Sequence, residues 1–265
     1  MTKTEFLDRF ARTGEERVLL SRVLDKAERC RTRRVPEHTG FLSPAEQAMV
    51  QDALKFYGDV QYLFRGGFEG AERCICFFLP DWMEEEYLTA DTEGTLTAVS
   101  ADISRANNIS HRDVLGSLMG IGLTREKLGD IIIAEDKAQC VLLKSAAGII
   151  LSQWEGIGRY NSSPVEIELN ELTVKAPQLK QITDTVATLR LDAVLSSGFS
   201  LSRTKASEYI AAGRVAINHR DCLKGDKAVS EGDVLTCRGL GKCVLREVSG
   251  MSKKGRTIIK IDRYI

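Results

Sequence analysis

The sequence predicts an α+β protein built from three domains. Residues 1–72 place apolar side chains mostly at helical spacing, and residues 73–170 alternate strand-like and helix-like segments. Residues 183–265 hold two short amphipathic segments followed by strands. A chain of 265 residues with 43% hydrophobic content has the length and composition of two or three globular domains.

The first region, residues 1–72, is expected to be mostly helical. A second helix should begin at Pro44, where Ser43 and Glu46 have the spacing of a capping box. The basic run at residues 29–34 has two interpretations of equal weight, a contact with RNA or a solvated helix end.

Three glycines, Gly66, Gly67 and Gly70, precede the next apolar run. A phosphate-binding loop follows a strand and ends in GK[ST], whereas these glycines precede a strand and lack that ending. We therefore interpret them as a structural turn, and the nearby Arg65 and Arg73 leave a binding role open.

The middle domain, residues 73–170, is predicted to run strand, strand, helix, strand, strand, helix, strand. This order resembles a split βαβ or ferredoxin-like (RRM-like) sheet. Such sheets often bind RNA through exposed aromatic side chains, but the aromatic pattern of an RRM is absent here. The HRD at residues 111–113 lacks the other kinase motifs, so a capped helix start at His111 is the better interpretation.

Charge is distributed unevenly along a chain whose net charge is zero. Residues 183–265 carry 15 Lys and Arg against 9 Asp and Glu, whereas residues 1–182 carry 22 against 28. The C-terminal domain is therefore the part expected to bind a polyanion.

The seven cysteines are scattered and contain no CxxC pair, and the three histidines lie far apart. We therefore expect no zinc site, no other metal site, no cofactor and a reducing, cytoplasmic setting. No apolar run approaches about 20 residues and the first ten residues do not form a signal peptide, so no membrane span is expected.

The most informative stretch is LRLDAVLSSGFSLSRTKASEYIAAGRVAIN, residues 189–218. Its two helical segments are separated by a Gly-containing turn, Ser202 can cap the second helix, and a strand follows Gly213. Arg203 lies where a helix dipole disfavours cations. For any one of these cations a solvated basic face is an equally good interpretation, but the cluster of Arg190, Arg203, Lys205 and Arg214 favours a phosphate site. Residues 171–188, before this stretch, are expected to form a short strand and a solvated linker, and residues 251–254 (MSKK) a basic turn.

The pattern RLD, GFS, SR, KA and GRV.IN resembles the S-four RNA-binding domain. The resemblance implies that both helices and the following hairpin face structured RNA, and that Asp192 orients Arg190 or another cation. The candidate RNA-binding residues are Arg190, Asp192, Ser202, Arg203, Lys205, Arg214, Asn218 and Lys224.

Along nearly its whole length the chain resembles the YlmH family, related to the ribosome quality-control factor RqcP, through FLSPAEQ, GGFEGAER and HRDVLGSLMGIGLTREKLGDI. The resemblance implies a non-catalytic, monomeric factor whose partners are rRNA of the large ribosomal subunit and tRNA. It further implies binding to large subunits that carry stalled peptidyl-tRNA, support of C-terminal tailing of the stalled peptide, and a link to cell division.

Two alternatives remain open at this point. An RNA-modifying enzyme, such as a pseudouridine synthase or an rRNA methyltransferase, can use the same module for targeting. Against it, no second catalytic-Asp motif appears, and Gly156 and Gly158 follow a helical stretch instead of a strand. The other alternative is a protein-interaction scaffold that docks through its acidic N-terminal portion.

Overall fold

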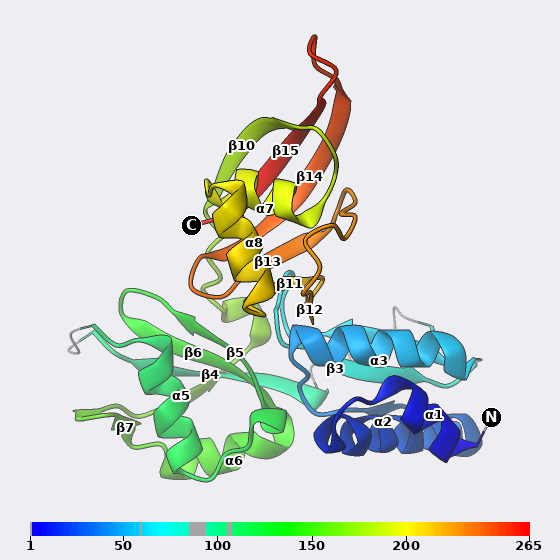
Figure 1. Ribbon diagram of the computed structural model, residues 1–265. Coiled ribbons are helices and arrows are strands. Elements are labelled where there is room, and N and C mark those ends of the chain that lie inside the picture. Colours follow the sequence, from blue (N-terminus) through cyan, green and yellow to red (C-terminus); the bar gives the residue numbers. More distant parts are fainter. Residues whose placement is uncertain (1, 59, 85–93, 105–107) are drawn as a thin grey trace. The chain divides into compact units, whose positions relative to one another are not determined.

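The computed structural model describes residues 2–58, 60–84, 94–104 and 108–265, and it confirms the predicted α+β class (Figure 1). The chain divides into two compact units, Met1–Val174 and Lys175–Ile265. Each unit has hydrophobic cores of its own, so each is described by itself.

Three helices open unit 1: α1 (Lys3–Phe10), α2 (Gly14–Arg33) and α3 (Pro44–Tyr57). Each begins with a capping box, and the one predicted at Ser43 and Glu46 is confirmed, with Pro44 in the first turn. Such boxes satisfy backbone N–H groups that the first helical turn leaves without a partner, and they fix where each helix starts.

These helices pack on a three-stranded antiparallel sheet of order β1-β3-β2, made by β1 (Glu37–His38), β2 (Gln61–Arg65) and β3 (Ile75–Leu79). The predicted domain boundary between residues 72 and 73 falls inside this sheet, because β3 pairs with both other strands. The strand that we had assigned to the middle domain thus belongs to the N-terminal sheet. The glycines of the β2–β3 connection form the turn between paired strands, as predicted.

The second part of unit 1 has the ferredoxin-like arrangement. Its strands are β4 (Leu96–Asp102), β5 (Leu128–Ile133), β6 (Lys137–Leu143) and β9 (Val165–Ile167), in the antiparallel order β5-β6-β4-β9. Helix α5 (His111–Gly120) connects β4 to β5, and α6 (Lys144–Gln153) follows β6. The short strands β7 (Gly156–Ile157) and β8 (Tyr160–Asn161) form a hairpin. The short 3-10 helix η2 (Arg125–Lys127) precedes β5, and the 3-10 helix η3 (Leu169–Glu171) follows β9.

The two faces of this sheet pack against different partners. One face packs on α5 and α6 through residues such as Val99, Cys140 and Leu142. The other face contributes Leu96 and Val141 to a core shared with Phe77 of β3. The N-terminal sheet and the ferredoxin-like sheet therefore form one folded body.

Hydrogen bonds from Arg73 fasten this junction. Its guanidinium donates to three backbone carbonyls, those of Phe41, Arg125 and Leu128, at 2.8–3.2 Å. The Asp130 carboxylate accepts from the backbone N–H groups of Glu72 and Arg73 at 2.6 and 3.1 Å, and burial raises the pKa of this carboxyl. The contacts of Arg73 are therefore structural and do not support the binding role that its sequence position left open.

Unit 2 is a six-stranded antiparallel sheet of order β10-β15-β14-β13-β11-β12 carrying two helices on one face (Figure 1). Its elements are β10 (Leu179–Val186), α7 (Leu191–Phe199), α8 (Arg203–Ala211), β11 (Val215–Ile217), β12 (Arg220–Asp221), β13 (Val234–Cys237), β14 (Gly241–Met251) and β15 (Thr257–Tyr264). The predicted domain start at residue 183 falls inside β10, which pairs with β15 along its full length. Residues 171–188, expected to form a short strand and a solvated linker, therefore include the edge strand β10.

Candidate nucleic-acid interface

The helix pair α7–α8 is held on the sheet by a buried apolar face. Leu191, Val194 and Leu195 of α7 and Ala206 and Ile210 of α8 are buried, as their spacing predicts. The backbone turns between the helices at Ser200, whose φ of 55° is left-handed, and the Ser202 hydroxyl then caps α8 by accepting from the Lys205 N–H at 3.1 Å. This packing leaves Arg203, Lys205 and Glu208 of α8 exposed, whereas Asp192, the charged residue of α7, is buried.

Arg190 and Asp192 form a two-bond ion pair at the start of α7. The Arg190 Nε and Nη2 atoms lie 3.3 and 3.1 Å from the two Asp192 oxygens. The Asp192 side chain is 12% exposed and that of Arg190 46%, so the carboxylate is held inside while the guanidinium edge reaches solvent. This is the geometry expected if Asp192 orients Arg190.

A second cationic group surrounds Tyr209 on α8. The Lys205 ammonium and the Arg214 guanidinium lie 5.7 and 5.6 Å from the centre of the Tyr209 ring. Lys205 also pairs with Glu208 at 2.9 Å, and the hydrogen bond that the ammonium donates to this carboxylate raises the pKa of Lys205. Within the described residues, Arg203 and Arg214 make no ion pair, so both remain available to an external anion.

Asn218 has both ends of its amide engaged within the protein. It lies after β11 with a left-handed φ of 48°, donates to Asp233 at 2.7 Å and accepts from the Val234 N–H at 2.9 Å. These two hydrogen bonds shape the turn after β11 and explain the position of Asn218. They leave its amide engaged within the protein and not open to an external ligand. Lys224, in contrast, is exposed in the loop after β12.

Sequence reasoning missed how the loop at residues 222–228 reaches α7. The carbonyls of Lys227 and Gly225 accept from the Leu191 and Asp192 N–H groups at 2.8 and 3.0 Å. The loop thereby brings exposed Lys224 and Lys227 to the same end of α7 as Arg190. The sequence held no clear signal of this approach, because a Cβ at Gly225 would make only ordinary contact with Asp192, at 3.5 Å.

The ferredoxin-like sheet does not offer an open face of the RRM kind. Gln139 and Ser100 are buried on the side away from α5 and α6, and Val141 packs there against the N-terminal sheet. Gln139 accepts from the Thr173 N–H at 2.7 Å and donates to the Glu171 carbonyl, so the segment after β9 covers it. A nucleic acid cannot stack on this surface without unfolding the junction.

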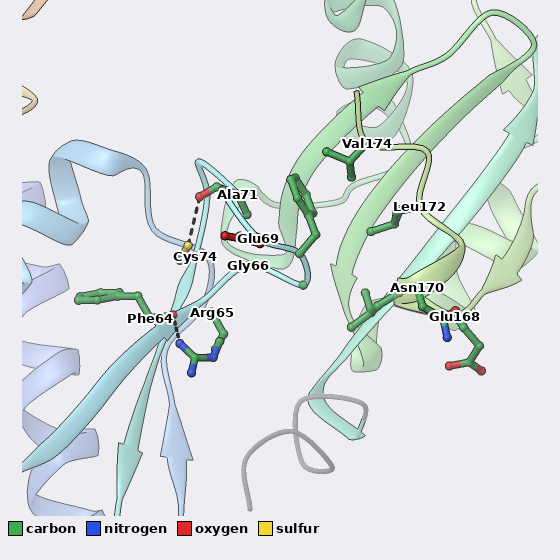
Figure 2. A pocket seen from close by; sticks show the side chains of 14 residues that line it. Phe64, Arg65, Gly66, Glu69, Ala71, Cys74, Glu168, Asn170, Leu172 and Val174 are labelled. Atoms are coloured by element: carbon green, nitrogen blue, oxygen red, sulfur yellow. Dashed lines mark hydrogen bonds between the residues drawn. The ribbon is translucent and has the colours of Figure 1, made fainter. Parts of the chain in front are cut away.

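Unit 1 contains a pocket of about 810 Å³ between the β2–β3 connection and residues 168–174 (Figure 2). Figure 2 shows Leu172 and Val174 on one wall, and the Arg65 guanidinium donating to the Phe64 carbonyl on the other. Gly66 and Gly67 have no room for a side chain, because a Cβ would lie 2.4 Å from Ala71 and 2.9 Å from Val141. The glycines therefore permit close packing, and the lining is mostly apolar.

The described residues contain no group of three His, Cys, Asp or Glu side chains placed to hold a metal ion. The cysteines are all free, and all but Cys222 are buried. Burial raises the pKa of Cys74 to about 11 and that of Cys243 to about 12, so these thiols stay protonated at neutral pH.

Residues 15–79 match a family model described as the N-terminal part of YlmH, and residues 94–174 match one for a proposed RNA-binding domain of YlmH. Residues 189–235 match the S4 domain. The chain is also 33% identical over 226 residues to the ribosome-associated protein quality control protein P2 of Bacillus subtilis, covering 85% of this chain and 86% of that protein.

This chain belongs to the YlmH family. The fold of a YlmH protein has been seen before, in the structure of the cell division protein YlmH from Streptococcus pneumoniae. That structure aligns with a TM-score of 0.51 at 20% identity, covering 61% of this chain and 96% of the solved one, and it supports the fold alone. The predicted C-terminal S-four domain of this YlmH chain is confirmed. Among the described residues, no YlmH helix has the length and apolar character needed to cross a membrane.

Proposed function

We propose that this protein is a ribosome-associated RNA-binding factor that acts without catalysing a reaction. The observation that carries the proposal is the outward face of α7 and α8, where Arg190, Arg203 and Arg214 are exposed over a buried apolar core. Guanidinium groups match phosphate geometry, and Arg203, unpaired among the described residues at the start of α8, gains little for the fold from its position. Lys205 and Lys224 add positive charge to the same surface. The Ser202 hydroxyl caps the start of α8. Asp192 orients Arg190, and Asn218 shapes the turn after β11 through Asp233.

We further propose the large ribosomal subunit as the partner, with rRNA and tRNA both within reach of the factor. The name of the Bacillus subtilis relative supports ribosome association. The finer proposal is that the bound subunits carry stalled peptidyl-tRNA, whose C-terminal tailing the factor supports, and that the cell-division link of the family follows from this role. The factor would act as a cytoplasmic monomer, which sedimentation equilibrium can test.

Co-sedimentation with purified Bacillus subtilis large subunits tests the interface. Arg203→Ala and Arg214→Ala should each weaken binding and lower the log–log salt slope by about one unit, because each removes one phosphate contact. Arg190→Ala should also weaken binding, but it leaves the buried Asp192 unpaired, so its folding must be checked by circular dichroism.

Lys260→Ala is the matched control. Lys260 is an exposed cation of the same unit and pairs with Glu247 at 2.8 Å. It lies on the sheet face opposite the helices, since its neighbours Ile259 and Ile261 point into the core with them. If Arg203→Ala and Arg214→Ala bind as well as this control, the helix-pair interface is wrong.

The alternative of an RNA-modifying enzyme has a separate readout. Mass mapping of rRNA from a strain lacking the protein should show an unchanged modification pattern. A missing pseudouridine or methyl group would overturn the non-catalytic proposal while leaving RNA binding intact.

A further inference from the structure

The hairpin between β14 and β15 ends in a turn whose charges the S4 match leaves out. The turn is SKKGR, residues 252–256, and it lies beyond the matched residues 189–235. Figure 1 shows this hairpin projecting from the end of the unit away from β11 and β12. Lys253, Lys254 and Arg256 thus bring three cations into five residues at the tip.

Hydrogen bonds within the turn close it. The Ser252 N–H donates to the Arg256 carbonyl at 2.8 Å, the Gly255 N–H donates to the Ser252 carbonyl at 2.9 Å, and the Ser252 hydroxyl accepts from the Arg256 N–H at 3.1 Å. Gly255 has a left-handed φ of 71°, which favours glycine. The Arg256 guanidinium donates to the Thr185 carbonyl of β10, which ties the tip to the sheet edge.

The charges at the tip lack the compensation that two cations on the same two strands have. Lys260 and Arg246 pair with Glu247 and Asp262. In the described part of the chain, neither Lys253 nor Lys254 contacts a carboxylate, and both are exposed. The fold therefore gains nothing from these two ammonium groups, and three like charges in one turn repel one another.

An apolar side chain accompanies the cations. Met251, the last residue of β14, is 77% exposed beside the turn. A projecting tip with several ammonium groups and a flexible apolar side chain fits the phosphate backbone of structured RNA, where lysines meet phosphates and an apolar group can contact a sugar or base.

We propose that the β14–β15 tip is a second RNA-contacting element of this protein, separate from the helix pair and binding the phosphate backbone through Lys253, Lys254 and Arg256. The inference rests on the proposed RNA-binding function and extends it to a surface outside the S4 match. A YlmH chain then holds RNA at two places on unit 2, with the tip adding affinity that depends on salt and not on base sequence.

The test is binding of the full-length protein to Bacillus subtilis large subunits across a salt series. Lys253→Gln with Lys254→Gln should weaken binding and flatten the log–log salt slope by about two units. The control, Lys260→Gln with Arg246→Gln, removes two charges from the same two strands where they are paired internally. The control should change the slope by less than about half a unit.

The outcomes separate this inference from the proposed function. If the tip variant binds like the control while Arg203→Ala binds weakly, the helix pair stands and the tip inference is overturned. If wild-type protein does not bind large subunits, both fall. A photoactivatable cross-linker at position 254 adds an independent readout: cross-links to rRNA or tRNA support the tip contact, and cross-links confined to ribosomal proteins refute it.

Discussion

At the scale of single residues, unit 2 depends on how closely α7 approaches the sheet. Gly198, in the last turn of α7, faces Cys243 of β14, and a Cβ built at Gly198 would lie 2.8 Å from the Cys243 sulfur. Both residues are buried in the core that carries the candidate RNA interface. The missing side chain therefore lets α7 pack this closely on β14.

Gly198→Ala should consequently destabilise unit 2. Overpacking of this kind costs roughly 1–3 kcal/mol, of which the better helix propensity of Ala returns up to about 1 kcal/mol. Urea unfolding of the variant, followed by circular dichroism, measures the difference. Gly148→Ala is the matched control, because Gly148 lies in α6 with nothing within 4 Å, so that change should be neutral or stabilising.

The sequence predicts side-chain contacts between near neighbours in the chain, but not contacts between residues that only the fold brings together. The box of Ser43 and Glu46 is predictable because its two partners are three residues apart. The engagement of Asn218 is not, since its partner Asp233 lies fifteen residues away and meets it only once β11 and β13 have paired. Tyr209 of α8 is half-buried: it packs against the core, and its ring also faces Lys205 and Arg214.

At the scale of elements, the short strand β9 is fastened by one carboxylate. Glu166 accepts from the Lys144 ammonium of α6 and from the Thr97 hydroxyl of β4, both at 2.6 Å. The hydrogen bond from Lys144, followed by that from Thr97, lowers the pKa of Glu166 below its usual range. One side chain therefore joins three elements of the ferredoxin-like sheet.

This arrangement predicts a pH dependence of stability. A carboxyl whose pKa is lower in the folded state stabilises the fold above its unfolded pKa, and that contribution is lost as the pH falls through the folded pKa. Wild type should therefore exceed Glu166→Gln in free energy of unfolding at neutral pH, and the gap should close as the pH falls below about 4. Urea unfolding at several pH values measures the gap; a gap that persists in acid would contradict the assignment.

Strand β10 shows why element boundaries were harder to predict than element types. Its sequence, LKQITDTV, has few apolar residues, because an edge strand on a sheet end buries little. It therefore reads like a solvated linker until its pairing with β15 is known. The misassignment of β3 has a different reason: its buried run predicts a strand but does not say to which sheet the strand belongs.

A truncation experiment follows from β10. A fragment of residues 175–265 should fold cooperatively, whereas a fragment of residues 183–265 loses half of β10 and its backbone bonds to β15. We expect a lower melting temperature for the shorter fragment, measured by circular dichroism. Equal melting temperatures would show that the edge strand contributes nothing to the stability of unit 2.

At the scale of the whole molecule, the two units carry opposite charge. Residues 175–265 contain 17 Lys and Arg against 9 Asp and Glu, whereas residues 1–174 contain 20 against 28. Counterion release on binding RNA depends on the cations that meet phosphates. Unit 2 is therefore expected to carry the salt-dependent part of ribosome binding.

The isolated fragment 175–265 should accordingly keep the salt slope of the full-length protein to within about half a unit. Binding to large subunits over a salt series measures it. A clearly smaller slope for the fragment would assign part of the phosphate contact to unit 1, in spite of the net negative charge of that unit.

The core shared by the two sheets of unit 1 limits how the gene can be divided by recombination. Phe77 and Leu79 from one sheet and Leu96 and Val141 from the other bury one another, although separate family models describe the two parts. A gene rearrangement that separated the two sheets would expose these apolar side chains to solvent in each product, and each product would then tend to aggregate. We therefore expect these two modules to be inherited together. Exchange of whole domains by recombination is expected at the boundary between unit 1 and unit 2, near residue 175.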